Sequence, residues 1–302
     1  MGCTSGGVRT KSSSGATKML HFRTLDWGMD ALRQLVVQLE FVESKGDAPF
    51  ARSLSYAGYV GVLTGVRRGL SMSLNFRPTH NGTSLFERFR FYAFQIMVIL
   101  GRRPSISSIL RHTLLTPTTT SLQTIASGLP SVPSTAAYLI FSDGEQTLVM
   151  EKDHVSATLM YRKDFIVATN HDRGDEGLED NTAPVNSSPV TRSIIGEVDA
   201  FREESVARKR CIRLDWQEAV ELATGVLPPG QGAPGDADLN FSADQADVVT
   251  WLEEWPITNE CTHYATILDP KEGTVNWLKR FLDPVESSDG SFTVSSEGLD
   301  SE

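Results

Sequence analysis

The chain has 302 residues, of which 40% are hydrophobic and 22% are charged, a composition typical of a globular protein with a substantial core. Its 28 basic and 38 acidic residues give a net charge of −10, which argues against a nucleic-acid partner. The longest apolar run, Phe91 to Leu100, is too short to span a membrane and predicts a core helix. Three cysteines without a closely spaced pair predict neither a disulfide framework nor a metal site, and no cofactor motif is present.

The chain begins with a predicted hairpin. Residues 6–8 and 18–22 form two short strands around a turn rich in Lys, Ser and Gly, and this hairpin brings Cys3 near Asp26. Further strands follow at 35–41, 53–66 and 70–75. Three glycines in the second of these, at positions 58, 61 and 65, indicate either a cleft where a ligand or backbone approaches or a poorly packed sheet.

Helices and strands then alternate in blocks. Such blocks predict an α+β fold of antiparallel sheets covered by helices. Residues 3–282 are predicted to form one domain, and the acidic tail 283–302 is predicted to be disordered. The predicted helices are 84–100, 105–115, 121–127, 197–214, 216–224 and 248–252, the predicted strands are 136–141, 146–150, 154–160, 164–169, 263–268 and 274–281, and 170–189 and 225–238 are predicted loops.

Four segments carry the functional signal: Cys3-Thr4-Ser5, His21–Gly28, Tyr56–Gly65 followed by Ser71–Asn75, and Ala168–Arg173. Together they resemble the acid ceramidase and N-acylethanolamine acid amidase family of N-terminal-nucleophile hydrolases. The resemblance implies a four-layer αββα sandwich of two antiparallel sheets. It also implies a cysteine amidase that splits the amide bond of a lipid N-acyl substrate, either ceramide or an N-acylethanolamine.

Cys3 is the predicted nucleophile. A terminal cysteine supplies both the thiol and the base, because its own α-amine titrates near neutrality and lies beside the sulfur. Two alternatives are an incidental buried cysteine and a lipidated start with myristoyl on Gly2 and palmitoyl on Cys3, although Gly6 stands where the myristoylation pattern takes Ser or Thr. As written, Gly2 blocks the amine of Cys3, so we expect activity only after its removal.

Arg23 and Asp26 are predicted to support Cys3. A guanidinium favours thiolate and developing negative charge, and a carboxylate orients the amine; an ordinary ion pair is the alternative. The resemblance implies that Asn170 donates to the oxyanion of the tetrahedral intermediate. It also places Asn75 beside the nucleophile, where its amide or the next backbone N–H could donate as well, with a turn-forming role as the alternative.

The resemblance implies that Tyr56, Gly58 and Tyr59 line the acyl site. The family carries a further arginine, for which Arg208 and Arg192 are the candidates here. Cys211 stands where acid ceramidase has a cysteine linked to its smaller subunit.

The resemblance implies an N-terminal small subunit ahead of the nucleophile, which this sequence does not contain, and a lysosomal, vacuolar or secreted location if a signal peptide lies upstream. The alternative functions are a non-catalytic or acyl-anchored homologue, an acyltransferase, and an amidase of the bile-salt or penicillin V type.

Overall fold

The computed structural model describes residues 2–11, 15–78, 84–116, 121–174, 189–225 and 241–286, without the side chains of 189–199. The strands are β1 (Gly2–Lys11), β2 (Thr17–Asp26), β3 (Val36–Phe41), β4 (Ala51–Tyr56), β5 (Thr64–Arg67), β6 (Leu70–Phe76), β7 (Ala137–Ser142), β8 (Thr147–Lys152), β9 (Ala157–Arg162), β10 (Phe165–Ala168), β11 (Thr262–Asp269) and β12 (Thr274–Arg280). The helices are η1 (Asp30–Leu35), α1 (Leu85–Ile99), α2 (Ile106–Leu115), α3 (Leu122–Gly128), η2 (Leu129–Ser131), α4 (Pro189–Thr224) and α5 (Gln245–Glu253).

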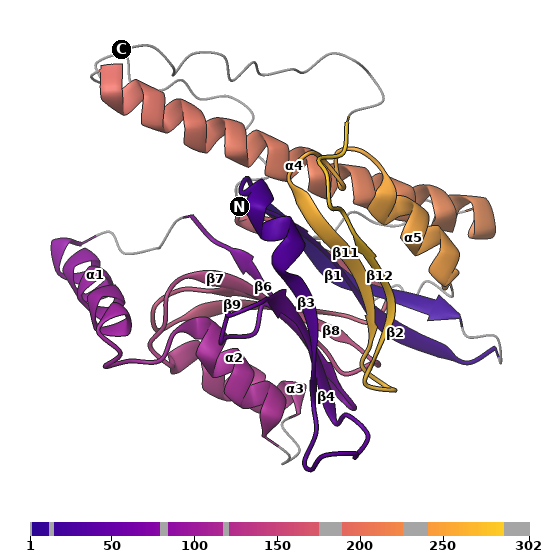
Figure 1. Cartoon of the computed structure of the whole chain (residues 1–302). Coiled ribbons are helices and arrows are strands. Elements are labelled where there is room, and N and C mark those ends of the chain that lie inside the picture. Colours follow the sequence, from indigo (N-terminus) through magenta and orange to yellow (C-terminus); the bar gives the residue numbers. More distant parts are fainter. Residues whose placement is uncertain are drawn as a thin grey trace.

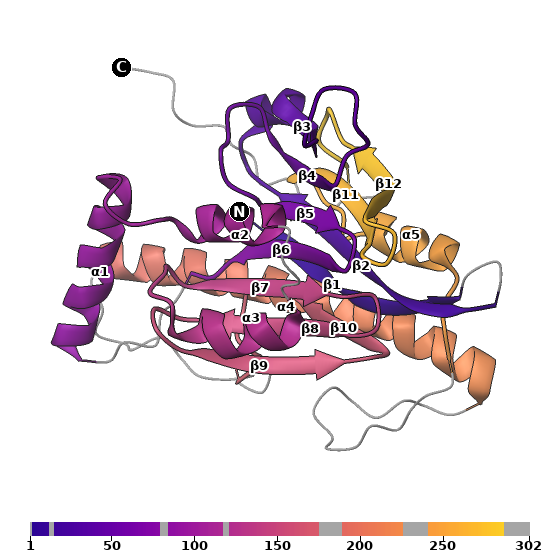
Figure 2. The ribbon, with the colours of Figure 1, turned by 90° about the horizontal axis from the view of Figure 1, so that it is seen from below.

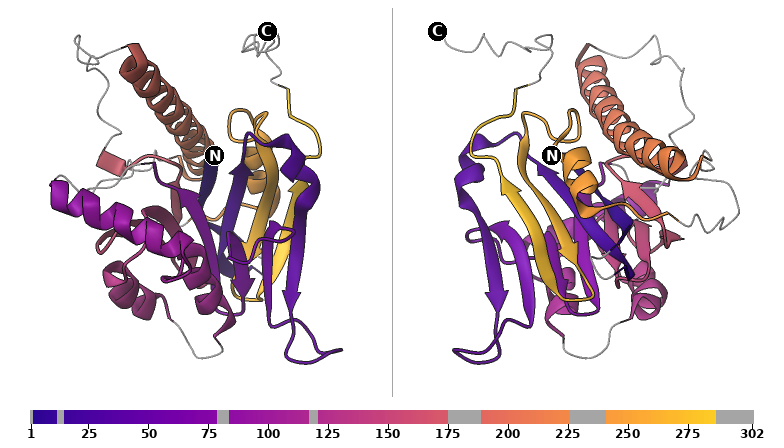
Figure 3. Two further views of the ribbon diagram at one scale, coloured as in Figure 1. Left: turned by 60° about the vertical axis from the view of Figure 1, so that its left-hand side comes forward. Right: turned by 90° about the vertical axis from the view of Figure 1, so that its right-hand side faces the viewer.

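These strands form two antiparallel sheets that pack face to face (Figure 1). The first sheet has the order β10-β1-β2-β11-β12, and the second has the order β3-β4-β5-β6-β7-β8-β9. Helices α4 and α5 cover the outer face of the first sheet, while α2 and α3 lie across the outer face of the second (Figures 2 and 3). The architecture is the four-layer αββα sandwich predicted from the sequence.

The predicted β1–β2 hairpin is confirmed and is longer than predicted. Its antiparallel register pairs Cys3 with Leu25 and Gly2 with Asp26. Because side chains alternate along a strand, Cys3 and Gly7 point to the same face, toward the second sheet. A Cβ on Gly7 would overlap the Thr147 side chain of β8. Glycine at this position therefore lets the two sheets approach closely at the middle of the strand that carries Cys3.

Serines start the three helices that follow β6, as the sequence predicted. The hydroxyl groups of Ser84, Ser105 and Ser121 accept hydrogen bonds from backbone N–H groups of the first turns of α1, α2 and α3. Each N-cap satisfies a donor that the helix itself leaves without a partner. The predicted helix at Phe91 to Leu100 is part of α1, but the prediction that it lies in the core was wrong. Of the residues of α1, only Phe91 and Phe94 are buried. Within the described residues, no helix is long and apolar enough to cross a membrane.

The predicted strand at 53–66 is two strands, β4 and β5, joined by a turn. Gly58 has a φ of 87°, which ends the extended conformation after β4. The glycines at 61 and 65 have a third explanation that differs from both predicted ones. A Cβ at Gly61 would collide with Ser107, and a Cβ at Gly65 would lie 2.8 Å from Leu114, so both glycines let α2 pack closely on the sheet.

Two predicted helices at 197–214 and 216–224 are one helix, α4, which starts earlier, at Pro189. No proline or glycine lies near Asp215 to interrupt it.

Strand β9 starts later than predicted, at Ala157. Residues 153–156 instead form a turn, which is closed by a hydrogen bond from Asp153 N to Ser156 O. Beyond residue 286, the predicted tail lies outside the described residues. Most of the predicted loops 170–189 and 225–238 lie outside them as well.

Candidate active site

Cys3 lies on β1 with its side chain fully buried between the two sheets. It belongs to the apolar cluster that also contains Leu25, Leu63 and Leu74. Burial raises the pKa of its thiol, and the nearby Arg23 opposes that rise. Burial therefore favours the protonated thiol, and a base that takes the proton would favour thiolate.

Arg23 is the cation nearest to that sulfur. It lies on β2, also fully buried, and its Nη2 donates to Cys3 Sγ at 3.4 Å and to the carbonyl oxygen of Leu74 at 2.7 Å. Its Nη1 donates to the carbonyl oxygen of Leu63 at 2.8 Å. These two backbone contacts hold the guanidinium against the thiol, where its positive charge stabilises developing thiolate.

Asn170 approaches Cys3 from the end of β10. Its Oδ1 accepts a hydrogen bond from the backbone nitrogen of Cys3 at 2.8 Å, and its Nδ2 donates to the carbonyl oxygen of Phe76 at 2.7 Å. The backbone N–H of Asn170 in turn donates to the hydroxyl of Ser205 on α4 at 2.7 Å. Asn170 is thus fixed from three sides, with its amide oxygen directed at the nitrogen of the predicted nucleophile.

Asp26 and Arg208 form a buried ion pair beside this point. Arg208 Nη1 lies 2.9 Å from Asp26 Oδ2, and both side chains are at most 1% exposed. The Thr262 hydroxyl donates to the other carboxylate oxygen at 2.8 Å, and Arg208 Nη2 donates to Asn170 Oδ1 at 3.1 Å. Of the two candidate arginines, Arg208 therefore joins the site, whereas the side chain of Arg192 lies outside the described residues.

The side chain of Asn75 is engaged with protein groups rather than with the thiol. Its Nδ2 donates to the backbone oxygens of Ala168 and Thr169, and its Oδ1 accepts from Ser5. The following backbone N–H, that of Phe76, is near enough to the Cys3 sulfur to lower the pKa of the thiol. Between the two options that the sequence left open for this position, the geometry favours the backbone donor.

The three residues predicted to line the acyl site lie in and after β4. Tyr56 is buried in the apolar cluster of Cys3, and its hydroxyl pairs with His263 Nδ1 at 2.8 Å. Gly58 and Tyr59 occupy the turn that follows, where Tyr59 is partly exposed. Tyr56 is therefore close to the thiol, while Gly58 and Tyr59 are nearer the surface.

Sequence reasoning missed two residues of this site. Ser205 fixes the backbone of Asn170, and Thr262 fixes Asp26. Ser205 precedes Arg208 by three positions, so both project from the same face of α4. That spacing was the signal for Ser205, and it was already present in the predicted helix at 197–214, where a serine lies one turn before the candidate arginine.

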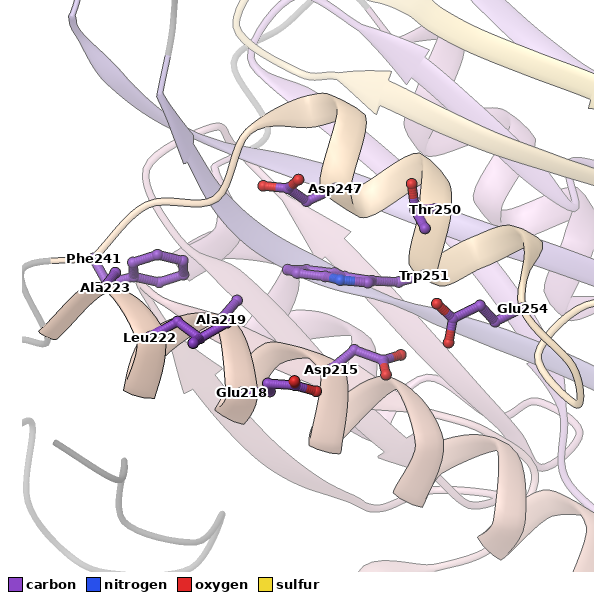
Figure 4. A pocket seen from close by; sticks show the side chains of 10 residues that line it. All are labelled: Asp215, Glu218, Ala219, Leu222, Ala223, Phe241, Asp247, Thr250, Trp251 and Glu254. Atoms are coloured by element: carbon purple, nitrogen blue, oxygen red, sulfur yellow. The ribbon is translucent and has the colours of Figure 1, made fainter. Parts of the chain in front are cut away.

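Away from Cys3, a pocket with a volume of about 500 Å³ lies between α4 and α5 (Figure 4). Its lining is aromatic and acidic: Asp215, Glu218, Ala219, Leu222, Ala223, Phe241, Asp247, Thr250, Trp251 and Glu254. Ligand atoms of Cys211, Asp215 and Glu254 lie within 4.8 Å of one another, so these residues could hold a metal ion. Acidic groups also gather at surfaces without an ion, and we assign no metal to them.

Replacing Asp215 by asparagine is expected to stabilise the protein at neutral and alkaline pH. Burial, and then the charge of Glu254, raises the pKa of Asp215 to about 7, so the ionised carboxylate disfavours the folded state. That penalty is absent below the unfolded pKa and grows as pH rises toward 7. We expect Asp215→Asn to gain about 1 kcal/mol, allowing for solvent screening, or roughly 2–4 °C in Tm at pH 8. Thermal unfolding at about pH 4 should show almost no gain, and an equal gain at both pH values would contradict this assignment.

Comparison with known proteins adds one finding. No protein-family model and no curated protein sequence matches the chain. Among solved structures, the chain is similar to a Caenorhabditis elegans N-acylethanolamine-hydrolyzing acid amidase (NAAA) ortholog, with a TM-score of 0.55 and 18% sequence identity over 88% of this chain and 93% of that one. At this level of identity, the likeness establishes a shared sandwich fold.

Proposed function

We propose that the chain is a cysteine amidase with an N-terminal nucleophile, acting on a lipid N-acyl substrate, and that Cys3 is the nucleophile. One observation carries the proposal: Arg23 donates to the Cys3 sulfur while Asn170 Oδ1 accepts from the Cys3 backbone nitrogen. A thiol, a cation and an oriented nitrogen thereby meet at one end of β1. The shared fold with an amidase, despite 18% identity, supports the same class of reaction.

The first step is attack by Cys3. Once Cys3 is the first residue, its α-amine takes the thiol proton and the sulfur adds to the substrate carbonyl carbon. Asn170 Oδ1 accepts one amine N–H, which leaves the nitrogen lone pair to face the sulfur. Arg23 stabilises the thiolate, and Asp26, which stands opposite Gly2 on the neighbouring strand, lies close enough to orient the protonated amine.

The tetrahedral oxyanion then needs hydrogen-bond donors. The backbone N–H of Phe76, which lies near the sulfur, is one candidate, and the second Nδ2 hydrogen of Asn170 is the other. As the intermediate collapses, the carbon–nitrogen bond breaks and the α-ammonium returns its proton to the leaving nitrogen. Water, deprotonated by the same amine, then splits the thioester into free Cys3 and a fatty acid.

The lipid nature of the acyl group rests on the surroundings of the thiol. Cys3 shares an apolar cluster with Tyr56, Leu63 and Leu74, which suits a hydrocarbon chain better than a polar one. The amidase that shares the fold is named for hydrolysing N-acylethanolamines. Ceramide and N-acylethanolamine are therefore the substrates to test first, and we place N-acylethanolamine ahead.

Protein that begins at Cys3 is expected to release fatty acid from a fluorescent N-acylethanolamine, from fluorescent ceramide, or from both. The matched control is the same chain with Cys3→Ala, in which release should fall by at least about a thousandfold because no other thiol replaces the nucleophile. The ratio of the two kcat/KM values selects the substrate class. No release of either fatty acid by protein shown to be folded would refute the lipid-amidase proposal.

A further inference from the structure

Arg77 and Asp172 form a further ion pair at the edge of the candidate active site. Arg77 directly follows Phe76, the last residue of β6, and Asp172 lies two positions after Asn170. Nε of Arg77 donates to Oδ1 of Asp172 at 2.8 Å, and Nη2 donates to Oδ2. The guanidinium therefore meets the carboxylate through two hydrogen bonds, an arrangement that fixes orientation as well as distance.

The second sheet holds both partners of this pair. The hydroxyl of Tyr138, on β7, donates to Asp172 Oδ1 at 2.7 Å. Nη1 of Arg77 donates to the carbonyl oxygen of Lys152, at the end of β8, at 3.3 Å. The side chain of Arg77 is 1% exposed and that of Asp172 is 24% exposed. Burial raises the pKa of the Asp172 carboxyl, but Arg77 and Tyr138 more than offset this and hold it below its usual value, so the pair is charged at neutral pH.

The ion pair connects the two sheets at the place where the proposed oxyanion donors meet. Phe76 ends β6 in the second sheet, whereas Asn170 follows β10 in the first, so each sheet contributes one donor. The two residues are joined directly by the hydrogen bond from Asn170 Nδ2 to the Phe76 carbonyl oxygen at 2.7 Å. Asn75 ties the same two segments on one side, through the carbonyl oxygens of Ala168 and Thr169. The ion pair ties them on the other side, so the donors lie between two cross-sheet contacts.

We propose that Arg77 and Asp172 are positioning residues, which hold the two oxyanion donors at the spacing that a single substrate oxygen requires. They act through their chain neighbours rather than on the substrate. The inference rests on the proposed amidase function, because the donors have this task only while a tetrahedral oxyanion forms. The alternative is an ion pair that contributes to folding alone. Placement matters to the rate, since a displacement of about 1 Å can cost roughly a hundredfold.

The first test measures kcat and KM for variants of the protein that begins at Cys3. Asp172→Asn keeps the shape of the side chain and removes its charge, and kcat should fall by about thirty- to a hundredfold while KM changes by less than about threefold. Arg77→Lys keeps the positive charge but loses the two-point contact, so its kcat should fall by about tenfold. The matched control is Glu40→Gln, which breaks an ion pair with Arg52 elsewhere in the second sheet and should leave kcat unchanged. Thermal unfolding verifies that each variant is folded.

A fatty aldehyde separates donor placement from a general change of the site. The Cys3 sulfur adds to the aldehyde carbon, and the thiol proton ends on the former carbonyl oxygen, which then lies where the oxyanion would form. In Asp172→Asn the inhibition constant of the aldehyde should rise by about tenfold or more. The primary alcohol of the same chain length forms no bond to sulfur, and its inhibition constant should change by less than about twofold.

Two results would overturn the positioning role and leave the amidase proposal intact. The first is a folded Asp172→Asn or Arg77→Lys variant with the kcat of the wild type. The second is equal weakening of aldehyde and alcohol, which would mean that the ion pair shapes the site as a whole. Should Asp172→Asn fail to fold, Arg77→Lys decides both comparisons. Wild-type protein that begins at Cys3 and releases no fatty acid would instead refute the amidase proposal, and the positioning role with it, so the two failures are distinguishable.

Discussion

A chain that keeps Met1 and Gly2 is expected to hydrolyse amides at least about a thousandfold more slowly than one that begins at Cys3. In the longer chain the nitrogen of Cys3 is a peptide nitrogen, whose lone pair is delocalised into the carbonyl group and takes no proton. Burial raises the pKa of the thiol, and Arg23 opposes that rise, so burial disfavours thiolate unless a base takes the proton. Without the free amine, the site has a nucleophile and no base.

Gly2 lies directly beside the ion pair of Asp26 and Arg208. A Cβ on Gly2 would lie 3.0 Å from both Asp26 Oδ2 and Arg208 Nη2. Under the proposed mechanism, the α-ammonium of a chain that begins at Cys3 would meet the Asp26 carboxylate in this region. Removing Gly2 clears this region at the same time as it creates the base, so both consequences should appear together.

The test compares two preparations of one protein, a chain that starts at Gly2 and a chain that starts at Cys3, with each terminus verified by intact mass. The rate of the Cys3 chain should rise with pH as the amine loses its proton, near the ordinary value of about 8 for α-amines. A chain that starts at position 3 and carries Cys3→Ser keeps the free α-amine but lacks the thiol. It should hydrolyse the substrate at a small residual rate at most. Equal rates for the Gly2 and Cys3 chains would assign the base to another group.

The block pattern of the sequence predicted antiparallel sheets covered by helices, and the family resemblance implied the αββα layers. The resemblance and the predicted hairpin also anticipated that Cys3, Arg23 and Asp26 lie together. The reason for this meeting is local: β1 and β2 pair in one antiparallel register, which sets Cys3 opposite Leu25 and Gly2 opposite Asp26. Arg208 could not be assigned in the same way. It lies 38 positions after Asn170, and only the length and direction of α4 decide which of its residues reaches Asn170 Oδ1.

The misjudged features share a physical cause, which is that they depend on what packs against an element rather than on the element itself. Gly61 and Gly65 were interpreted as signs of a cleft or a poorly packed sheet. The strand sequence does not indicate that α2 packs against these two positions. The apolar run in α1 was predicted to be a core helix because apolar side chains favour burial. The sequence does not show whether another element covers them, and most of them are exposed. Asn75 was located correctly, but its side-chain direction depends on β10.

Arg208→Met is expected to destabilise the protein by about 3–5 kcal/mol at neutral pH and to abolish most activity, because the change leaves the Asp26 carboxylate buried without its partner. Burial already raises the pKa of Asp26, and Arg208 and Thr262 oppose that rise. Without Arg208 the folded pKa should rise further, so the penalty for the ionised form grows as pH rises above the unfolded value. The loss of stability should therefore be larger at about pH 8 than at about pH 5.

Urea unfolding at both pH values measures this loss, and Arg210→Met is the matched control because it changes an exposed arginine of the same helix. Adding Asp26→Asn to Arg208→Met removes the unpaired charge and should restore a large part of the stability without restoring activity, since Asn170 Oδ1 still lacks its partner from α4. A double variant as unstable as Arg208→Met would mean that Arg208 acts through packing, and its contact with Asp26 would then contribute little to folding.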